Sequence, residues 1–229
     1  MSERRPVLLL FARAPVEGTV KTRLVPPLTA PGALRLYRAF LEDASRVYRP
    51  DDLWESVLEA EPDPEDPELV KLFGPPWRRE AQAPGDLGSR LAGAFRRAFA
   101  AGAPSAVAVG SDQPALPRGR IEEAFHPLSK GTSASLIPAE DGGYCAIGLS
   151  AGAPVDEIFR DIPWSSSSAL SVTRERMQRA SVSVAVLEAS YDIDRPEDLE
   201  RLRRELSARD ASAPDFPAAT ARALAEILP

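Results

Sequence analysis

A continuous apolar run at Val7 to Phe11, VLLLF, constrains the fold of this chain most. It contains no alternating polar residues, which is typical of a strand buried on both faces of a parallel sheet. Other strand-like segments lie at 53–60, 77–82, 105–109, 134–137, 144–149 and 182–187. Predicted helices lie at 33–48, 87–99, 121–128, 167–179, 196–206 and 218–228. Strands and helices thus alternate, which predicts right-handed crossovers and a three-layer α/β fold with a mostly parallel central sheet.

The composition narrows the classes of protein that this chain can belong to. The 229 residues, 44% of them hydrophobic, are enough for one sizeable domain over 1–229. A net charge of −6 argues against a nucleic-acid-binding surface. One cysteine, Cys145, excludes an internal disulfide, and one histidine, His126, argues against a zinc enzyme or a Ser-His-Asp hydrolase. The segment 61–68, EPDPEDPE, is predicted to be an exposed loop because its prolines and acids are too polar to pack.

The lengths of the apolar segments indicate where in the cell the protein is expected to be. Arg13 ends the N-terminal apolar run well short of a signal-peptide core, and no other run is long enough to span a bilayer. We therefore expect a cytoplasmic protein whose partner is a small molecule. The sequence leaves the oligomeric state open.

Three polar segments follow predicted strands, where ligands bind in open α/β sheets. The first, FARAPVEGTVKTRL from Phe11, differs from a P-loop because Val20 stands where that pattern needs its second glycine. We interpret it as another kind of phosphate-binding loop, in which Lys21 and Arg23 clamp phosphates. The alternative is an exposed basic turn. If the loop binds phosphates, alanine at either position should weaken nucleotide binding by roughly 1.5–3 kcal/mol with little change in thermal stability.

The other two segments, GSDQPAL and YDIDRPEDL, supply carboxylates. Asp112 comes directly after a predicted buried strand and is a candidate ligand for a hard divalent cation or, alternatively, a helix cap. Asp192 and Asp194 share one side if their segment is extended. Asp194 also fits an N-cap before Pro196, so both of its roles stay open.

Three further stretches are candidate site elements with ordinary structural alternatives. Asp86 and Arg90 open a predicted helix, where the first is equally a cap and the second a solvated side chain. The Asp141-Gly142-Gly143 stretch is a hairpin signal whose glycines would also let a ligand approach the backbone. Trp164 is a candidate for stacking on a ring, and a half-buried core position is the alternative.

Taken in order, six segments resemble a family of bacterial GT-A-like transferases, the radical-SAM and selenodomain-associated glycosyltransferases of the nucleotide-diphospho-sugar transferase superfamily. The segments are FARAPVEGTVKTRL, GDLGSRL, VGSDQPAL, PAEDGGYCAIGL, IPWSSSSALSVT and YDIDRPEDL. They extend over nearly the whole chain, and six segments in the family's order are far more specific than any one. The resemblance implies a Rossmann-like GT-A fold.

The resemblance also implies roles for single residues. The catalytic residues would be Lys21, Arg23 and Asp112. The nucleotide-binding residues would be Ala12, Arg13, Gly18, Lys21, Arg23, Asp86 and Arg90. The residues binding the acceptor or sugar would be Asp141, Gly142, Gly143 and Trp164. Asp112 and Asp194 would hold the metal, Mg²⁺ or Mn²⁺.

Two reactions are compatible with such a site. A glycosyltransferase passes a sugar from a nucleotide donor to a small acceptor, whereas a guanylyltransferase-like nucleotidyltransferase joins NMP to a phosphorylated small molecule and releases pyrophosphate. The family resemblance favours glycosyl transfer. A nucleotide-binding protein without catalysis is a third possibility, and the retention of the ionic side chains argues mildly against it.

Overall fold

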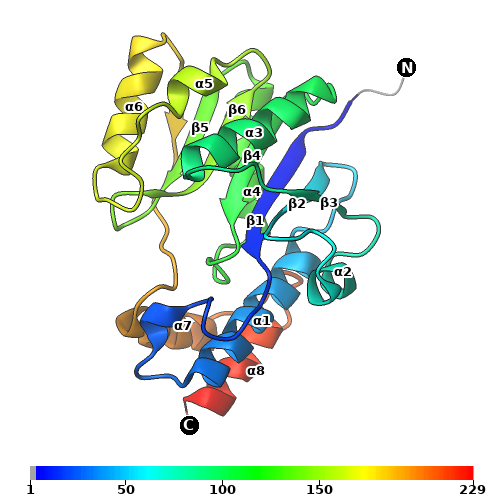
Figure 1. Ribbon diagram of the computed structural model, residues 1–229, viewed down its shortest axis with the longest axis vertical. Helices are drawn as coiled ribbons and strands as arrows, with labels where there is room; N and C mark the ends of the chain where they lie inside the picture. Colours follow the sequence, from blue (N-terminus) through cyan, green and yellow to red (C-terminus); the bar gives the residue numbers. More distant parts are fainter. Residues whose placement is uncertain (1–3, 229) are drawn as a thin grey trace.

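The computed structural model describes residues 4–228 and contains one seven-stranded sheet (Figure 1). Its strands are β1 (Val7–Arg13), β2 (Glu55–Glu61), β3 (Arg78–Ala81), β4 (Ser105–Gly110), β5 (Ala134–Pro138), β6 (Tyr144–Ser150) and β7 (Val184–Val186). The strand order is β3-β2-β1-β4-β6-β5-β7, and β6 is antiparallel to both of its neighbours, β4 and β5. The predicted α/β fold with a mostly parallel sheet is confirmed.

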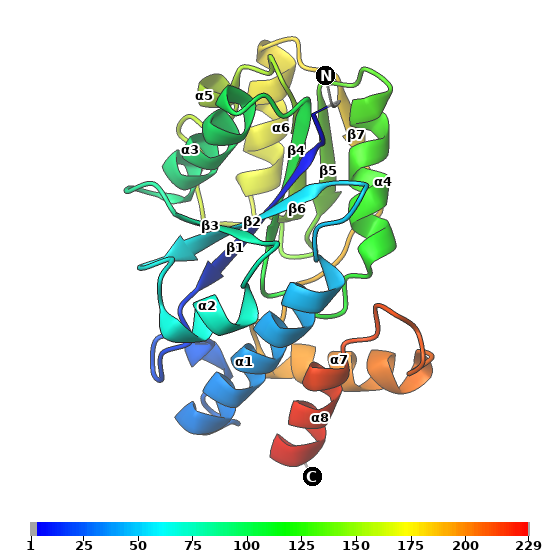
Figure 2. The same cartoon turned by 90° about the vertical axis from the view of Figure 1, so that its right-hand side faces the viewer.

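Helices cover both faces of this sheet. They are α1 (Ala30–Val47), α2 (Pro67–Leu72), α3 (Leu87–Ala100), α4 (Arg118–Ser129), α5 (Val155–Ile158), α6 (Ala169–Arg179), α7 (Pro196–Ala208) and α8 (Ala218–Ile227). Helices α3, α5 and α6 lie on one side of the sheet and α4 on the other, as Figure 2 shows. Helices α7 and α8 lie with α1 at the lower end of the molecule in Figure 1, below the carboxyl ends of β1 and β4.

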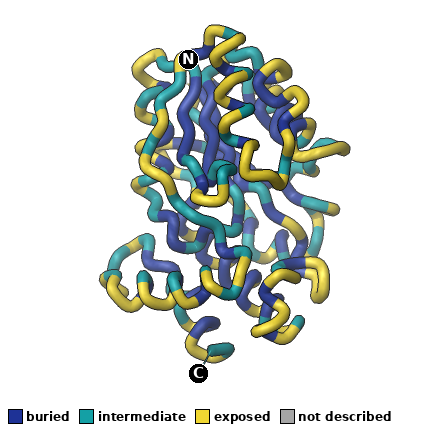
Figure 3. Tube along the Cα trace, turned by 90° about the vertical axis from the view of Figure 1, so that its left-hand side faces the viewer, coloured by how far each residue is buried: buried dark blue, intermediate teal, exposed yellow. Residues whose placement is uncertain are grey.

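Strand β1 explains why the sheet needs two helical layers. Leu8 and Leu10 belong to the hydrophobic cluster that contains buried residues of α1 and α4, while Val7 and Leu9 belong to the cluster that contains those of α3. Because successive side chains of a strand point to opposite faces, a continuous apolar run buries both. In Figure 3 the strands are accordingly dark blue, and exposed residues gather on the outer helices and loops.

Two short helices were not predicted. Helix α2 begins within the stretch read as an exposed loop, because Asp66 caps it by accepting hydrogen bonds from the N–H groups of Glu68 and Leu69. Helix α5 has only four residues, too few for an apolar period to be visible. Neither changes the topology. No helix in residues 4–228 has the length and apolarity needed to cross a membrane.

Candidate active site

The loops that follow β1, β4 and β7 meet at the carboxyl edge of the sheet. The loop after β1 contains Lys21, β4 ends just before Asp112, and the segment after β7 contains Asp194. The N–H of Ile193 donates a 3.0 Å hydrogen bond to the carbonyl oxygen of Asp112, which joins the second and third of these loops. The structure thus brings together residues that lie far apart in the sequence.

The ammonium group of Lys21 lies between the two aspartates. Its Nζ is 2.9 Å from Oδ1 of Asp112 and 3.0 Å from Oδ1 of Asp194. It donates a third hydrogen bond, 2.7 Å long, to the carbonyl oxygen of Ile193. All three N–H groups therefore have acceptors. The backbone of Lys21 is left-handed, with φ at 50°, a conformation that non-glycine residues keep only where their surroundings impose it.

Burial and the neighbouring negative charges shift the pKa of Lys21 in opposite directions. Its side chain is only 4% exposed, and burial alone would lower its pKa, but the carboxylates of Asp112 and Asp194 outweigh this effect and raise the pKa above its ordinary value. The two carboxylates are 42% and 43% exposed. Arg23 is far more exposed and places Nη1 3.5 Å from Oδ2 of Asp194. The site is therefore a buried cation beneath two carboxylates that solvent reaches.

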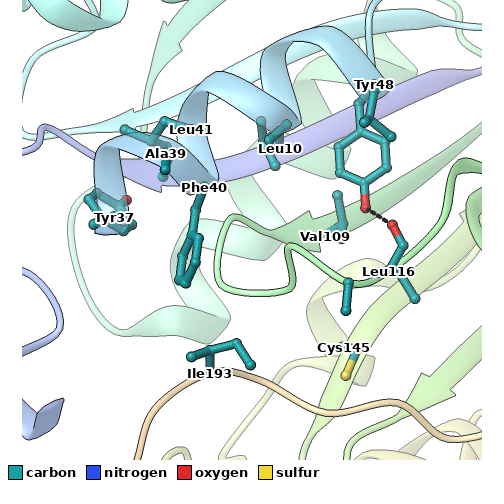
Figure 4. Close-up of a cluster of buried hydrophobic side chains, with 14 of the residues drawn as sticks. Leu10, Tyr37, Ala39, Phe40, Leu41, Tyr48, Val109, Leu116, Cys145 and Ile193 are labelled. Carbon is teal, nitrogen blue, oxygen red and sulfur yellow. Dashed lines mark hydrogen bonds between the residues drawn. The ribbon is translucent and has the colours of Figure 1, made fainter. Parts of the chain in front are cut away.

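Helix α1 packs against the side chain of Lys21 through Phe40. Phe40 points from this helix toward Ile193 (Figure 4), and Nζ of Lys21 lies 5.9 Å from the centroid of the Phe40 ring. Tyr37 accepts a 2.9 Å hydrogen bond from the N–H of Arg13, and its hydroxyl lies 3.2 Å from Oγ of Ser111. These contacts fix the end of β1 and the residue before Asp112. Sequence reasoning assigned neither aromatic residue a role in the site.

Asp194 does not cap helix α7, which was its alternative role. The capping function falls to Asp198, whose Oδ2 accepts hydrogen bonds from the N–H groups of Asp194 and Arg195 at 3.0 and 2.7 Å. The side chain of Asp194 is left free to face Lys21. Asp112, whose carboxylate also faces Lys21, caps no helix, since α4 begins after Pro117.

Asp192 faces a different part of the site. Its Oδ1 accepts a 2.7 Å hydrogen bond from Nε2 of Gln113, which also donates to the carbonyl oxygen of Cys145 at 3.0 Å. Burial, followed by the negative charge of Asp112, raises the pKa of Asp192 to about 6. Sequence reasoning predicts only that Asp192 lies on the same side of its segment as Asp194, and it assigns no role to Gln113.

Arg13 and Arg90, both predicted to bind nucleotide, meet on one carboxylate. Oε2 of Glu61 lies 3.0 Å from Nε of Arg13 and 2.5 Å from Nη1 of Arg90. Arg90 also donates to Oε1 of Gln82 at 3.1 Å, so it is held in place and is not merely solvated. The hydrogen bond from Arg90 is the main cause of the lowered pKa of Glu61.

The remaining predicted nucleotide-binding residues have clear local roles. Asp86 is the N-cap of α3 and accepts hydrogen bonds from N–H and Oγ of Ser89 at 2.8 and 2.7 Å, which is its structural alternative. Ala12 is buried near the end of β1. Gly18 has φ at 76° in the exposed turn of the first loop, a conformation that suits glycine.

The predicted acceptor-binding residues lie at the turn between β5 and β6. Oδ1 of Asp141 accepts a 2.9 Å hydrogen bond from the N–H of Gly143, and Gly142 has φ at 92°. A Cβ on Gly142 would overlap the backbone of Ser167, so the group that approaches this glycine belongs to the chain itself. Trp164 is half-buried and packs edge-on against Tyr144, with ring centroids 6.1 Å apart.

The carboxylates suit a divalent cation of the hard type. Lys21 engages Oδ1 of both Asp112 and Asp194, and Oδ2 of Asp194 lies 3.5 Å from Nη1 of Arg23. Both aspartate side chains are half-exposed. Within residues 4–228, no group of three or more acidic, cysteine or histidine side chains is arranged to hold a metal. Mg²⁺ in proteins is usually held by one or two carboxylates together with waters and substrate phosphates. Two half-exposed carboxylates such as Asp112 and Asp194 are the donor set that such an ion would need from the protein.

Comparison with known proteins places the chain in a family. Residues 46–166, more than half of the chain, match the family described as uncharacterized proteins conserved in bacteria, DUF2064. The chain belongs to the DUF2064 family. The matched region of the family includes Asp86, Arg90, Asp112 and the turn at 141–143. No curated protein matches the chain in sequence.

Solved structures share the fold of this DUF2064 chain. A candidate nucleotide-diphospho-sugar transferase from Desulfovibrio desulfuricans G20 is 29% identical, with a TM-score of 0.85 and 97% of each chain covered. A cytidylyltransferase from Leptospira borgpetersenii is 12% identical, with a TM-score of 0.60 and coverage of 99% of this chain and 94% of that one. CMP:2-keto-3-deoxy-manno-octonic acid synthetase, solved with CTP, is 11% identical, with a TM-score of 0.53 and coverage of 89% and 98%. The fold is therefore that of nucleotide-diphospho-sugar transferases.

Proposed function

We propose that this protein is a metal-dependent transferase that uses a nucleotide or nucleotide-sugar donor, and that it transfers a glycosyl group to a small acceptor. The observation that carries the proposal is the convergence of Lys21, Asp112 and Asp194 at the carboxyl edge of the sheet. Ligands of open α/β sheets bind at this edge. The likeness to the Desulfovibrio protein, described as a candidate nucleotide-diphospho-sugar transferase, supports the same class of reaction.

The basic residues of the site would contact the phosphates from different sides. Arg23, which is exposed beside Asp194, would bind phosphate oxygens from the solvent side. Lys21 would supply a fixed positive charge beneath them, already oriented by its three acceptors. Arg13, at the end of β1, and Arg90, in the first turn of α3, are further cations joined through Glu61.

The carboxylates of Asp112 and Asp194 would hold Mg²⁺ or Mn²⁺, with the ion taking the place of the 3.5 Å contact between Asp194 and Arg23. Such an ion, when bound, neutralises charge that develops on the phosphate oxygens. Asp112 and Asp194 would also prevent a bare polyanion from binding well, since their negative charges repel phosphate unless a cation lies between. Nucleotide binding and metal binding are therefore expected to depend on each other.

Glycosyl transfer is favoured over nucleotidyl transfer by the resemblance of six segments to the radical-SAM and selenodomain-associated glycosyltransferases. Nucleotidyl transfer is the second candidate because the fold is shared with cytidylyltransferases. In both reactions the chain's residues would bind the same phosphates, and the bond that breaks would differ. The products decide between them.

The test is a panel of donors with product analysis. The protein is incubated with each NTP, Mg²⁺ and a sugar phosphate, and separately with UDP- and GDP-sugars, Mn²⁺ and candidate acceptors. Release of nucleoside diphosphate with loss of the sugar supports glycosyl transfer, whereas release of pyrophosphate supports nucleotidyl transfer. Binding without either product would make the protein a nucleotide-binding protein without catalysis. No binding of any donor would contradict the proposal.

Two variants show whether the activity belongs to this site. Asp112→Asn keeps the shape of the side chain and removes its charge, so it should reduce turnover at least about 100-fold. Asp156→Asn is the matched control, because Asp156 is an exposed acid on α5 that pairs with Arg96. Equal activity of both variants would remove Asp112 from the site.

A further inference from the structure

A cavity adjoins the phosphate-binding site described above and shares Asp112 with it. Its volume is about 160 Å³. It is lined by Phe11, Leu87, Leu91, Ala108, Val109, Gly110, Asp112, Gln113, Tyr144, Cys145, Ala146, Ile147 and Asp192. These residues come from the carboxyl halves of β1 and β4, from β6, from the start of α3 and from the segment after β7. The cavity therefore adjoins the proposed reaction centre.

The size of the cavity limits what can enter it. An apolar protein cavity of about 150 Å³ is large enough to hold a benzene molecule. The present cavity therefore has room for one six-membered ring. Leu87, which is 44% exposed, is part of the lining, and Asp112 adjoins both the cavity and Lys21. A ring in the cavity would thus lie next to the bound phosphates.

The polar side chains of the cavity are two carboxylates, the amide of Gln113, the thiol of Cys145 and the hydroxyl of Tyr144. The Tyr144 hydroxyl is buried and can both donate and accept hydrogen bonds. The charged residues that line it are Asp112 and Asp192, and no basic side chain of residues 4–228 is among its lining. Oδ1 of Asp192 is fixed by the 2.7 Å hydrogen bond from Gln113, which is only 7% exposed. Because Nε2 of Gln113 donates to Asp192 and to the carbonyl oxygen of Cys145, its Oε1 is a further acceptor, and this atom is buried with no partner in the described part of the chain.

The carboxylates and the amide oxygen that line the cavity favour an uncharged ring whose own groups can donate hydrogen bonds. Two carboxylates repel phosphate or carboxylate groups inside the cavity, which excludes an anionic ring. The carboxylates and Oε1 of Gln113 accept hydrogen bonds, while the Tyr144 hydroxyl both donates and accepts, and ring hydroxyl groups, which also do both, can satisfy all of them. The side chains of Phe11, Leu91 and Ile147 provide apolar walls against which the C–H face of a saturated ring can pack.

We propose that this cavity binds the uncharged, polyhydroxylated six-membered ring of the sugar or acceptor, a pyranose or a cyclitol, with Asp192 accepting hydrogen bonds from its hydroxyl groups. Gln113 acts as a positioning residue, because it holds Asp192 in place. The proposal rests on the proposed function only in assigning the ring to a substrate of the transferase. The binding of the ring itself can be measured independently of catalysis.

The test is ligand-observed NMR by saturation transfer on the full chain at pH 8, with and without UDP and Mn²⁺. The probes are glucose, mannose, myo-inositol, glucose 6-phosphate, cyclohexanol, cytidine and guanosine. We expect saturation transfer to a pyranose or to the cyclitol, with glucose 6-phosphate and cyclohexanol at least about tenfold weaker. Preference for mannose or glucose over myo-inositol identifies a pyranose site, and the reverse preference identifies a cyclitol site.

Variants locate the bound ring. Asp192→Asn keeps the size of the side chain and should weaken binding of the ring about 10- to 100-fold, the range for a lost hydrogen bond to a charged group. Ala108→Val adds volume at the cavity wall and should exclude the ring without touching a charge. Asp156→Asn, on the surface of α5, is the control for both. Thermal melting of each variant verifies that it is folded.

Several results would overturn the proposal. These are binding of no ring under either condition, binding of glucose 6-phosphate as tight as that of glucose, and unchanged affinity in both cavity variants. Binding of cytidine or guanosine that Ala108→Val abolishes would make the cavity a base pocket instead. Nucleotide binding in the presence of Mn²⁺ is measured in parallel. Ring binding without nucleotide binding would retain the cavity and reject the transferase function, and the opposite result would reject only the cavity.

Discussion

Replacing Lys21 by methionine removes the ammonium group that joins three loops and keeps most of the side chain's length. The variant loses hydrogen bonds to Asp112, Asp194 and the carbonyl oxygen of Ile193. It also leaves two carboxylates facing one another with no buried counter-charge. From the sequence alone, loss of this lysine is expected to have little effect on thermal stability. The 4% exposure of its side chain in the structure changes that expectation.

The magnitude follows from how far water can replace the lost contacts. Removing one partner of a fully buried ion pair costs about 3–5 kcal/mol. Here the carboxylates of Asp112 and Asp194 are 42% and 43% exposed, so water rehydrates them in the variant. We therefore expect a loss of about 2 kcal/mol in the free energy of unfolding. For a chain of this size, that corresponds to a decrease in Tm of roughly 4–8 °C.

Urea and thermal denaturation, each with and without Mg²⁺, measure this effect. Arg23→Ala is the control, because Arg23 is 69% exposed and its contact with Asp194 is 3.5 Å long, so its loss should change stability by less than about 0.5 kcal/mol. Mg²⁺ should stabilise Lys21→Met more than the wild type, since it can supply the missing positive charge. A variant as stable as the wild type and indifferent to Mg²⁺ would refute the bridging role of Lys21.

Two further changes test other parts of the structure. Glu59 is 1% exposed, and burial raises its pKa from 4.5 to about 7 despite its contact with an arginine, so the folded state binds a proton that the unfolded state does not. Stability should fall by about 3 kcal/mol as the pH rises from about 4.5 to about 7. Glu59→Gln should flatten that slope, whereas Glu65→Gln, at an exposed acid that pairs with Arg79, should retain it. Denaturation curves across this range that keep the slope in Glu59→Gln would exclude Glu59 as its source. Gly142 and Gly131 both have φ at 92°, but only a Cβ on Gly142 meets other atoms, those of Ser167. Gly142→Ala should therefore lose at least about 2 kcal/mol more in urea denaturation than Gly131→Ala, and equal losses would mean that backbone strain alone is responsible.

Regular patterns made most of the fold predictable. The apolar run of β1 indicates a strand between two layers, and the Asp-Gly-Gly stretch marks the hairpin in which Pro138 pairs with Tyr144. Helix α2 is not predicted because its segment is rich in acidic residues and prolines. The helix-capping signal in that segment, Asp66 directly before a proline, carries less weight. The antiparallel direction of β6 follows from that same short turn, since a parallel partner needs a longer connection.

The site was less accessible to sequence reasoning because it depends on tertiary contacts. Asp112 and Asp194 each follow a strand, and this rule sufficed to predict that they meet. The bridging position of Lys21 depends on its left-handed backbone, which no local pattern signals. The contact between Gln113 and Asp192 joins residues 79 positions apart, and Tyr37 reaches the end of β1 from the buried face of a helix. Such contacts become visible only when the elements are packed.

Isothermal titration calorimetry of nucleotide binding tests the central claim most directly. Each NTP, UDP-glucose and a GDP-sugar are titrated into the wild type and Asp112→Asn, with Mg²⁺ or Mn²⁺ and then with excess chelator. We expect at least one of these nucleotides to bind the wild type in the presence of metal, and its affinity to fall at least about tenfold with chelator and in the variant. Affinity that is unchanged by chelator and by loss of the Asp112 charge, or no binding of any nucleotide, would contradict the account.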